Sequence, residues 1–304
     1  MGTRRSGERG VRVLVLGGEG MLGHKMVQAL SARFPETWCT LRGQKDAPSL
    51  APVPELRTER VIEGVDVVDF AALEALLRAR RPDVVVNCVG VIKQRVEAAA
   101  AVPSITINSL LPHRLAAVLE TWGGRLIHFS TDCVFSGRKG HYTEDDASDA
   151  EDLYGKSKFL GEVAGPNALT LRTSIIGREL EYHASLLDWF LLGGRRHVRG
   201  FRQVFWSGVT TNHLAGVVAD LIERYADLGG LFQVSSGRIS KYDLLCLLRD
   251  GYGMAVEVEP DDGPREDRSL EGSRFAAAVG YRCPPWPQLI RELVGDPTPY
   301  ARPR

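Results

Sequence analysis

Residues 11–34 constrain the fold of this chain more than any other part of its sequence. The first six of them are apolar apart from Arg12, as is typical of a parallel strand buried on both faces. Gly17, Gly20 and Gly23 come next, and a helical pattern follows them. A strand, a glycine-rich turn and a helix in this order predict a unit that binds a dinucleotide.

Each of the three glycines suits such a site for a different reason. Gly17 permits a tight turn, Gly20 lets the backbone approach a pyrophosphate, and Gly23 lets the helix pack against the strand. The phosphates would rest on the free amides at the helix N-terminus. The spacing is Gly-x-x-Gly-x-x-Gly, which differs from the Gly-x-Gly-x-x-Gly form. A purely structural turn is the alternative, and the surrounding strand and helix favour nucleotide binding.

The rest of the first half continues the alternation of strands and helices. Further buried strands are expected at residues 37–41, 61–65, 83–88, 125–130 and 168–173, with helices at 70–80 and 104–122. This alternation predicts an α/β fold with a Rossmann-like doubly wound parallel sheet.

The second half has a looser pattern and is expected to form a smaller lobe. Helices are expected at 184–192, 214–225, 240–251 and 289–294, and a short strand at 231–234. We expect residues 11–175 to form the dinucleotide-binding Rossmann domain and residues 176–295 mainly a C-terminal α/β substrate-binding lobe. Because this lobe is assembled from scattered segments, its boundary is expected to be discontinuous. Residues 1–10 are expected to be a disordered leader and residues 296–304 a mobile tail.

Tyr154 and Lys158 lie four residues apart in a segment, 150–163, whose composition suits a helix. This spacing places both side chains on one helix face. A nearby cation favours the phenolate by lowering the pKa of a tyrosine, which is about 10 when unperturbed. Tyr154 is therefore a candidate general acid or base, and an ordinary pair on a helix surface is the alternative.

Polar residues near the carboxyl ends of the strands are candidates for ligand binding. Arg42 follows the second strand, where an acid would favour NAD and an arginine can accommodate the 2′-phosphate of NADPH; a solvated arginine is the alternative. Asp66 follows the third strand and could meet the adenine amine. Asn108 is a poor helix-interior residue, which indicates a polar role near the site or simple exposure. The hydroxyl of Thr131, after the fifth strand, would lie beside whatever group Tyr154 protonates.

Four motifs in order along the chain carry a family resemblance. They are Gly17-x-x-Gly20-x-x-Gly23, Asn87-Cys88-Val89-Gly90, Ser130-Thr131-Asp132-Cys133-Val134-Phe135 and Tyr154-Gly155-Lys156-Ser157-Lys158. Together they resemble the extended short-chain dehydrogenase/reductase superfamily and, more narrowly, its dTDP-4-dehydrorhamnose reductase branch of sugar-nucleotide reductases. The narrower match depends mostly on Ser-Thr-Asp-x-Val-Phe, on Leu171-Arg172-Thr173-Ser174 and on Thr210-Thr211.

The resemblance implies catalytic roles for Thr131, Tyr154 and Lys158. Tyr154 would donate a proton to a carbonyl oxygen as hydride arrives from the nicotinamide, and Thr131 would hydrogen-bond the same oxygen. Lys158 would bind the nicotinamide ribose and tune Tyr154. Donors aimed at an alkoxide that develops only in the transition state lower the barrier. The resemblance also implies a cofactor site lined by Gly17, Gly20, Met21, Leu22, Gly23, Arg42, Asp66, Val67, Asn108, Tyr154 and Lys158, with Gly90 beside it.

The expected substrate site combines the end of the fifth strand with a basic cluster in the second half. The run 195–202 is rich in arginine and is followed by aromatic residues, which suits the phosphates and base of a nucleoside diphosphate. A solvated loop or a dimer contact is the alternative. The candidate substrate-binding residues are Thr131, Asp132, Arg199, Arg202 and Trp206.

Cys133 departs from the pattern of the branch, which usually has tyrosine at this position. We therefore expect sugar recognition to differ from that of the branch. A cysteine nucleophile is the other interpretation, but a lone cysteine is more often a small packing residue.

Composition excludes several classes of protein. Lys plus Arg equals Asp plus Glu, at 38 each, so nothing favours a nucleic-acid or membrane-surface partner. No apolar run approaches the ~20 residues of a membrane span. The five cysteines are scattered, which suits a reduced, cytoplasmic protein without disulfides or structural zinc. The seven histidines show no metal-ligand spacing, so no metal ion is expected.

The sequence as a whole predicts an NADPH-dependent reductase, with NADH possible, that acts on the 4-keto group of an NDP-4-keto-6-deoxyhexose. The partner is then a nucleotide sugar, and a homodimer is possible. Within the same superfamily, an NDP-sugar epimerase or dehydratase is the alternative, for which Asp132 after the catalytic hydroxyl would be the acid. A non-catalytic NADP-binding regulatory subunit, such as that of methionine adenosyltransferase, is the alternative from another class.

Overall fold

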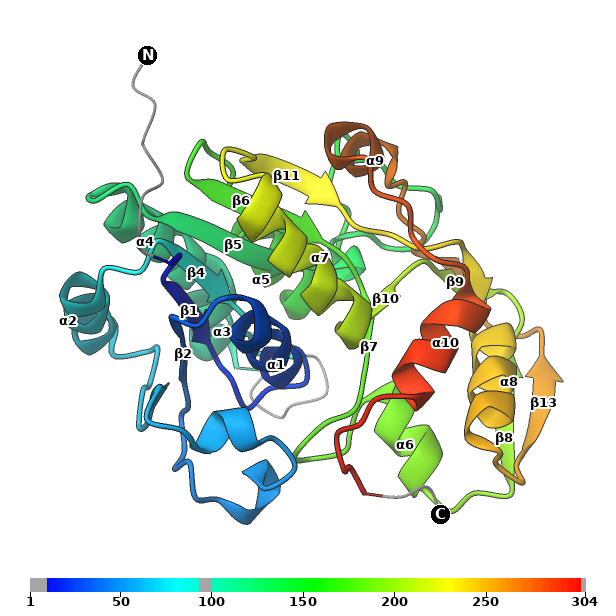
Figure 1. The fold of residues 1–304 in the computed structure, drawn as a ribbon. Coiled ribbons are helices and arrows are strands. Elements are labelled where there is room, and N and C mark those ends of the chain that lie inside the picture. The colour runs from blue at the N-terminus through cyan, green and yellow to red at the C-terminus, as the bar shows by residue number, and fades with distance from the viewer. Residues whose placement is uncertain (1–9, 93–99, 302–304) are drawn as a thin grey trace.

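The computed structural model describes residues 10–92 and 100–301 of the 304-residue chain. The leader expected at residues 1–10 lies almost wholly outside the described residues. Figure 1 shows a large sheet flanked by helices, next to a smaller group of helices and short strands from the C-terminal half. The predicted α/β class is confirmed.

The large sheet has seven parallel strands in the order β11-β6-β5-β4-β1-β2-β3. They are β1 (Val13–Leu16), β2 (Thr37–Thr40), β3 (Val61–Ile62), β4 (Val84–Asn87), β5 (Arg125–Ser130), β6 (Ala168–Arg172) and β11 (Gly230–Gln233). The chain builds from β1 outward to β3 and then crosses back to β4 on the other side of β1. The predicted doubly wound sheet is confirmed, and its strand order reverses between β1 and β4, where such sheets bind ligands.

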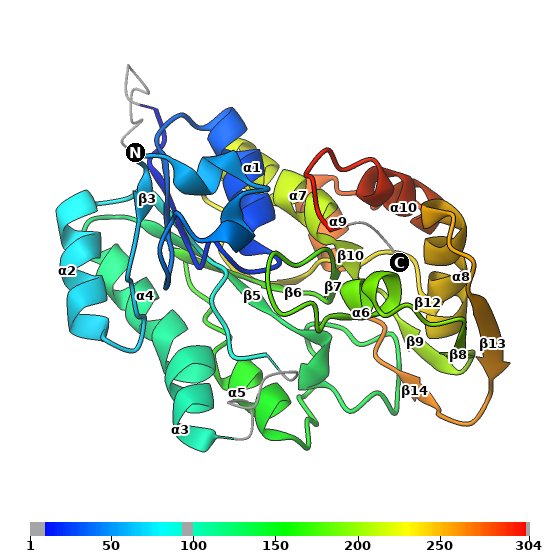
Figure 2. The same cartoon turned by 90° about the horizontal axis from the view of Figure 1, so that it is seen from below.

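Helices cover both faces of this sheet (Figures 1 and 2). The flanking helices are α1 (Gly23–Arg33), α2 (Phe70–Arg80), α4 (Leu111–Glu120) and α7 (Thr211–Arg224). Val13 and Val15 of β1 share one apolar core with α1 and α7. Leu14 and Leu16 share a second core with α2 and α4. Because successive strand side chains point to opposite faces, all four residues of β1 are buried.

The helix predicted at 104–122 has three parts in the structure. They are α3 (Ala101–Ser104), a π-helical segment η4 (Ile105–Leu110) and α4, and α5 (Leu153–Leu160) packs against the first two. Short 3₁₀ turns occur at η1 (Pro48–Leu50), η2 (Pro54–Arg57) and η5 (Asp132–Val134).

The C-terminal lobe has an apolar core of its own, which includes the paired indole rings of Trp206 and Trp286. Its elements are β7 (Ile175–Ile176), α6 (Leu186–Leu192), β8 (His197–Phe201), β9 (Val204–Trp206), β10 (Val209–Thr210), β12 (Ile239–Ser240), α8 (Lys241–Tyr252), β13 (Glu257–Asp261), β14 (Glu266–Asp267) and α10 (Trp286–Val294). The helix α9 (Ser273–Val279) packs instead against β11, and its Phe275 belongs to a core of the large sheet. The strands form three small sheets: β10-β7, β12-β9-β14 and β13-β8. Between these segments the chain returns to the large sheet through α7 and β11.

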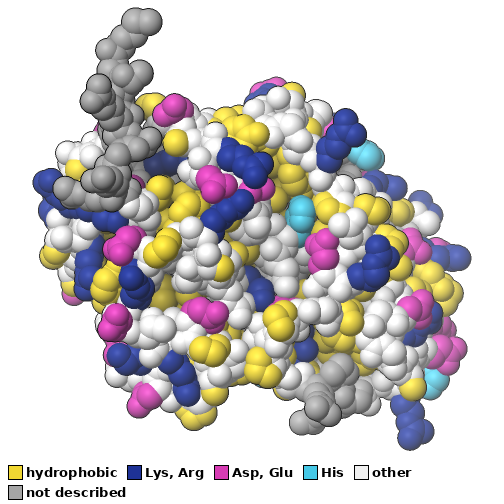
Figure 3. All heavy atoms as spheres, in the orientation of Figure 1, with side chains coloured by type: hydrophobic (Ala, Val, Ile, Leu, Met, Phe, Trp, Pro, Cys, Tyr) yellow, Lys and Arg dark blue, Asp and Glu magenta, His cyan; other side chains and the backbone are white. Residues whose placement is uncertain are grey.

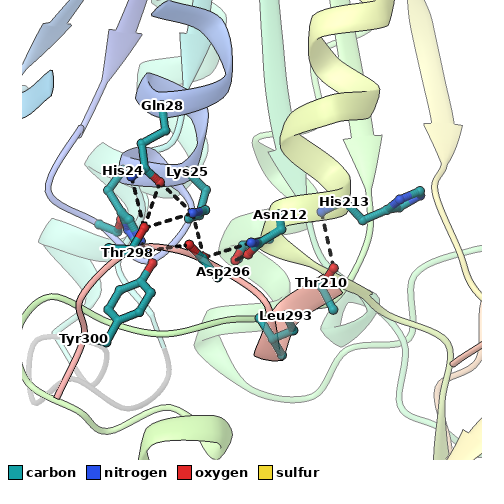
Figure 4. A network of polar contacts seen from close by, with 12 residues as sticks. His24, Lys25, Gln28, Thr210, Asn212, His213, Leu293, Asp296, Thr298 and Tyr300 are labelled. Carbon is teal, nitrogen blue, oxygen red and sulfur yellow. Dashed lines mark hydrogen bonds and ion pairs between the residues drawn. The ribbon is translucent and has the colours of Figure 1, made fainter. Parts of the chain in front are cut away.

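The expected mobile tail is instead packed against the body of the protein as far as residue 301 (Figure 4). Asp296 accepts hydrogen bonds from Lys25 Nζ at 2.7 Å and from Asn212 Nδ2 at 2.8 Å. Arg178 Nη2 donates to the carbonyl of Ala301 at 2.7 Å. The tail therefore forms hydrogen bonds with α1, with α7 and with the loop that follows β7.

The surface mixes charges of both signs, and neither sign gathers into a large patch on the face shown in Figure 3. Among the described residues, no helix is long and apolar enough to cross a membrane.

Candidate active site

A cleft of about 440 Å³ opens at the carboxyl ends of β1, β4 and β5 and extends to the C-terminal lobe. Most of the residues predicted for the site line this cleft: Gly20, Met21, Leu22, Arg42, Gly90, Thr131, Asp132, Tyr154, Lys158 and Trp206. A second hollow of about 460 Å³ lies between α1, β2 and η2 and contains none of the predicted residues. The first cleft is therefore the candidate site.

The glycine turn has the shape that a pyrophosphate site requires. Gly17 has a φ of 79°, and a Cβ there would lie 2.9 Å from Val89. A Cβ on Gly23 would lie 1.9 Å from the carbonyl oxygen of Gly17. These two glycines shape the turn without lining the cleft, whereas Gly20 lines it. No side chain caps the N-terminus of α1, which fits the binding of a dinucleotide phosphate.

At the end of β2 the structure brings Glu19 next to Arg42. Both side chains line the cleft, and the carboxylate of Glu19 accepts the backbone N–H of Arg42 at 3.0 Å. Burial raises the pKa of Glu19, the N–H groups of Arg42 and Gly43 oppose this shift, and the charge of Glu181 adds to it. The sequence shows no acid directly after β2, so Glu19 is a site residue that the pattern did not reveal.

Thr131 and Tyr154 meet where β5 and α5 approach each other. Thr131 caps η5, and its Oγ1 accepts the N–H of Cys133 at 3.1 Å. Asp152 caps α5 by accepting the N–H of Gly155 at 2.7 Å, which places Tyr154 in the first turn. Tyr154 and Thr131 are within hydrogen-bonding contact. The two hydroxyls therefore face the same space in the cleft.

The protonation of Tyr154 differs from the expectation. Burial raises its pKa above the ordinary value, the nearby Cys133 and Asp132 add to the rise, and the Thr131 hydroxyl opposes it. The predicted lowering by Lys158 is therefore not what the structure shows. Such a tyrosine keeps its proton throughout the neutral range, which suits a proton donor more than a base.

Lys158 lies one turn further along α5, is buried and lines the cleft. Its Nζ donates to the carbonyl of Phe129 at 2.6 Å. Burial lowers its pKa to about 8, and the charge of Glu162 partly opposes this shift. The bond to Phe129 fixes the ammonium group at the end of β5, beside the two hydroxyls.

Asn108 is buried behind the wall of the cleft and does not line it. Its side chain accepts the N–H of Val91 at 2.9 Å and donates to the Val91 carbonyl at 3.0 Å. It also donates to Ser157 Oγ at 3.1 Å. Asn108 therefore joins the loop after β4 to α5, and it positions the cleft wall where Gly90 is exposed.

Asp66 and Val67 also lie outside the residues that line the cleft. Val67 is buried in the core beneath α2, and Asp66 Oδ1 accepts the N–H of Val68 at 3.0 Å. Both residues lie in the turn between β3 and α2.

Arg199 and Arg202 do not reach the cleft. β8 pairs with β13, so Arg199 forms an ion pair with Asp261 at 3.2 Å, and Arg202 Nε donates to Asp262 at 2.9 Å. Both arginine side chains are largely exposed. The structure thus separates them from Trp206, the third residue predicted from this segment.

Lys241 is a cation in the cleft wall that was not among the residues predicted from the sequence. It begins α8, lines the cleft and lies over the ring of Trp206, with its Nζ 4.1 Å from the ring centroid. Among the described cleft-lining residues, the cations are Arg42, Lys158 and Lys241. Burial lowers the pKa of Lys241, and the nearby carboxylate of Asp132 opposes this shift. No sequence signal distinguished it from an ordinary solvated lysine.

Cys133 lies in the cleft wall, and Arg268 Nη1 is 3.8 Å from its sulfur. Among the described residues, no group of three or more His, Cys, Asp or Glu side chains could hold a metal ion.

Comparison with known proteins places the chain in a family. The sequence profile of the RmlD substrate binding domain matches residues 11–294. A probable dTDP-4,6-dihydroxy-2-methyloxan-3-one 4-ketoreductase from Streptomyces antibioticus is 30% identical over 77% of this chain and 75% of its own. Methionine adenosyltransferase 2 subunit beta from Xenopus tropicalis is 26% identical over 92% of this chain and 89% of its own.

A solved structure shows the same fold. The dTDP-4-dehydrorhamnose reductase from Bacillus anthracis, solved in complex with NADP, superposes with a TM-score of 0.76, over 94% of this chain and 99% of its own. Its sequence is only 18% identical, so this likeness supports the fold alone. With its family profile matched over residues 11–294, this chain belongs to the RmlD substrate binding domain family.

Proposed function

We propose that the protein is an NADPH-dependent reductase of the 4-keto group of an NDP-4-keto-6-deoxyhexose. The observation that carries this proposal is the convergence of Thr131, Tyr154 and Lys158 in one cleft that also contains the glycine turn. The 4-ketoreductase from Streptomyces antibioticus supports the reaction class. For the cofactor we propose NADPH, because Arg42 lines the cleft at the end of β2 and suits a 2′-phosphate, with NADH as the alternative.

The residues suggest a division of roles in the reaction. The reduced nicotinamide supplies the hydride when it is bound. Tyr154 donates its proton to the carbonyl oxygen of the sugar, and Thr131 hydrogen-bonds the same oxygen. An alkoxide is far more basic than a phenolate, so the raised pKa of Tyr154 does not prevent this transfer. Lys158 presents its ammonium group to the ribose hydroxyls and holds that end of the cofactor near the two hydroxyls.

The cofactor end is proposed at the glycine turn. The pyrophosphate would lie at Gly20, Met21 and Leu22, on the uncapped N-terminus of α1. Arg42 would face the adenosine ribose and accept the 2′-phosphate of NADPH. Replacing Arg42 with Ala is therefore expected to weaken NADPH binding more than NADH binding.

The substrate end is proposed between Asp132, Trp206 and Lys241. The sugar 4-keto group would lie at Thr131 and Tyr154, and Lys241 would meet the phosphate attached to the opposite side of the sugar ring. The ring face of Trp206 contacts the ammonium group of Lys241 and helps to hold it in place. Arg199 and Arg202 are left out of this site because both lie outside the cleft and face carboxylates.

A regulatory subunit is the second candidate function, and the similarity to methionine adenosyltransferase 2 subunit beta favours it. The presence of Thr131, Tyr154 and Lys158 in one cleft does not exclude this role, because a protein can bind a dinucleotide there without turnover. Epimerase or dehydratase chemistry remains the alternative within the enzyme class.

Oxidation of NADPH, followed by the loss of absorbance of the reduced nicotinamide, tests the proposal. The substrates are a panel of dTDP- and UDP-4-keto-6-deoxy sugars, run with the protein and with its Tyr154→Phe variant. Turnover that disappears in the variant supports the reductase. Tight NADPH binding without turnover of any sugar, together with co-purification of a partner enzyme, supports the regulatory subunit.

A further inference from the structure

Glu19 is a cleft residue with no part in the reaction described above. It belongs to the glycine turn, but its carboxylate reaches the end of β2, 23 residues further along the chain. There the two carboxylate oxygens accept the backbone N–H of Arg42 at 3.2 and 3.0 Å. The N–H of Gly43 makes a further contact with it.

The end of the second strand is where a Rossmann fold meets the adenosine ribose. A carboxylate at this place accepts the 2′-hydroxyl of NADH, and an arginine accommodates the 2′-phosphate of NADPH. By sequence, this position has Arg42 and no acid. In the folded protein it has both charges, because Glu19 supplies the carboxylate from the glycine turn.

Glu19 opposes a 2′-phosphate in two ways. Its negative charge repels the phosphate, and it already occupies backbone N–H groups that could otherwise bind phosphate oxygens. A ribose 2′-hydroxyl meets neither obstacle, because it can donate a hydrogen bond to the same carboxylate. The carboxylate and Arg42 therefore act in opposite directions on the choice between the two cofactors.

We infer that Glu19 is a specificity-determining residue that offsets Arg42 and lets the protein bind NADH alongside NADPH. This inference rests on the proposed function only in taking the cleft as a dinucleotide site. It does not depend on which sugar is reduced, or on whether any sugar is.

The test is the dissociation constant of NADPH and of NADH, measured by nicotinamide fluorescence at one fixed pH and ionic strength for all variants. Glu19→Gln keeps an oxygen that accepts the N–H of Arg42 but removes the charge. It is expected to raise the preference for NADPH by about fivefold or more, as for the loss of one like-charge interaction. Glu19→Ala also frees the N–H groups and is expected to raise the preference further.

Glu63→Gln is the matched control. Glu63 accepts the N–H of Lys45 at 2.7 Å, so it contacts the same loop, but it does not line the cleft. Its replacement removes the same charge and is expected to change the preference by less than about twofold, as for most surface substitutions.

The outcomes separate this inference from the reductase proposal. Unchanged preference in Glu19→Gln, with both cofactors still bound, overturns the inference and leaves the reductase intact. An equal change in Glu63→Gln also overturns it, because the effect is then one of general charge. A shifted preference without turnover of any keto-sugar supports the inference and overturns the reductase. If the unmodified protein binds neither cofactor, the inference and the proposed cofactor are both wrong.

Discussion

A methyl group on Gly155 would lie 2.2 Å from the carbonyl oxygen of Cys133, because α5 lies directly against the turn that follows β5. This approach brings Tyr154 to Thr131. Gly155→Ala is expected to destabilise the protein by about 1–3 kcal/mol, the usual cost of overpacking, and to lower turnover by separating the two hydroxyls. Urea unfolding and NADPH oxidation would measure the two effects.

Gly216→Ala in α7 is the control for this change. A Cβ on Gly216 meets no atom within 4 Å, and the residue is exposed inside a helix. Alanine there is expected to stabilise the protein by about 0.5–1 kcal/mol. Equal destabilisation by both substitutions would show that the contact with Cys133 is not the cause.

Tyr154→Phe removes the proposed proton donor and keeps the ring. Turnover is expected to fall by about 10²–10⁴-fold, the usual contribution of a positioned acid. Thr131 can still hydrogen-bond the substrate oxygen in this variant, but the group that transfers a proton to that oxygen is missing. NADPH affinity is expected to stay nearly unchanged. Turnover close to that of the unmodified protein would contradict the mechanism.

Lys158 gives the reaction a pH dependence with a definite sign. Its pKa is lowered to about 8, so the ammonium group is charged below that pH and loses its proton as the pH rises through it. The value of kcat/KM, which reports groups of the free enzyme, is expected to fall above about pH 8. Tyr154, with its raised pKa, keeps its proton over this range.

Lys158→Arg identifies the group responsible for this decline. An arginine remains charged at every pH of the experiment, although its geometry differs and overall activity is expected to be lower. The decline above pH 8 should disappear in this variant. A decline of the same shape in both proteins would assign it to another group.

The convergence of Tyr154, Lys158 and Thr131 in one cleft was predictable, because each residue is part of a short motif whose spacing is set by one element. Tyr154 and Lys158 are one helical turn apart, and Thr131 directly follows a buried strand, so local sequence determines where they lie. The parallel sheet was predictable for the same reason, from apolar runs such as that of β1.

Other features depend on which distant segments meet, and a single sequence does not show this. The Arg-rich run resembled a phosphate site. In the structure, however, the pairing of β8 with β13 brings carboxylates next to these arginines, and Arg199 and Arg202 form ion pairs with them. Glu19 and Lys241 reach the cleft only because their elements converge there. The polar tail looked mobile because its partners lie more than 80 residues away in the chain.

Lys241→Met tests the substrate end of the cleft. Methionine keeps most of the side-chain volume over Trp206 but removes the charge. The KM for the nucleotide sugar is expected to rise about tenfold or more, the effect of losing one hydrogen bond to a charged group, with a smaller change in kcat. Arg202→Met is the control and should leave KM unchanged. The reverse result would restore the assignment made from the sequence.

Asp296→Ala tests whether the packed tail contributes to stability. Asp296 and Lys25 form an ion pair at 2.7 Å in which both side chains are less than 10% exposed (3% for Asp296 and 9% for Lys25). Removing the carboxylate leaves the ammonium of Lys25 buried and dependent on Gln28 and Thr298 alone (Figure 4). The free energy of unfolding is expected to fall by about 3 kcal/mol, as when one partner of a buried ion pair is removed.

Asp262→Ala is the control. It breaks an exposed ion pair with Arg202 and should change the free energy of unfolding little. Similar urea midpoints for both variants would mean that the tail packs without stabilising the fold.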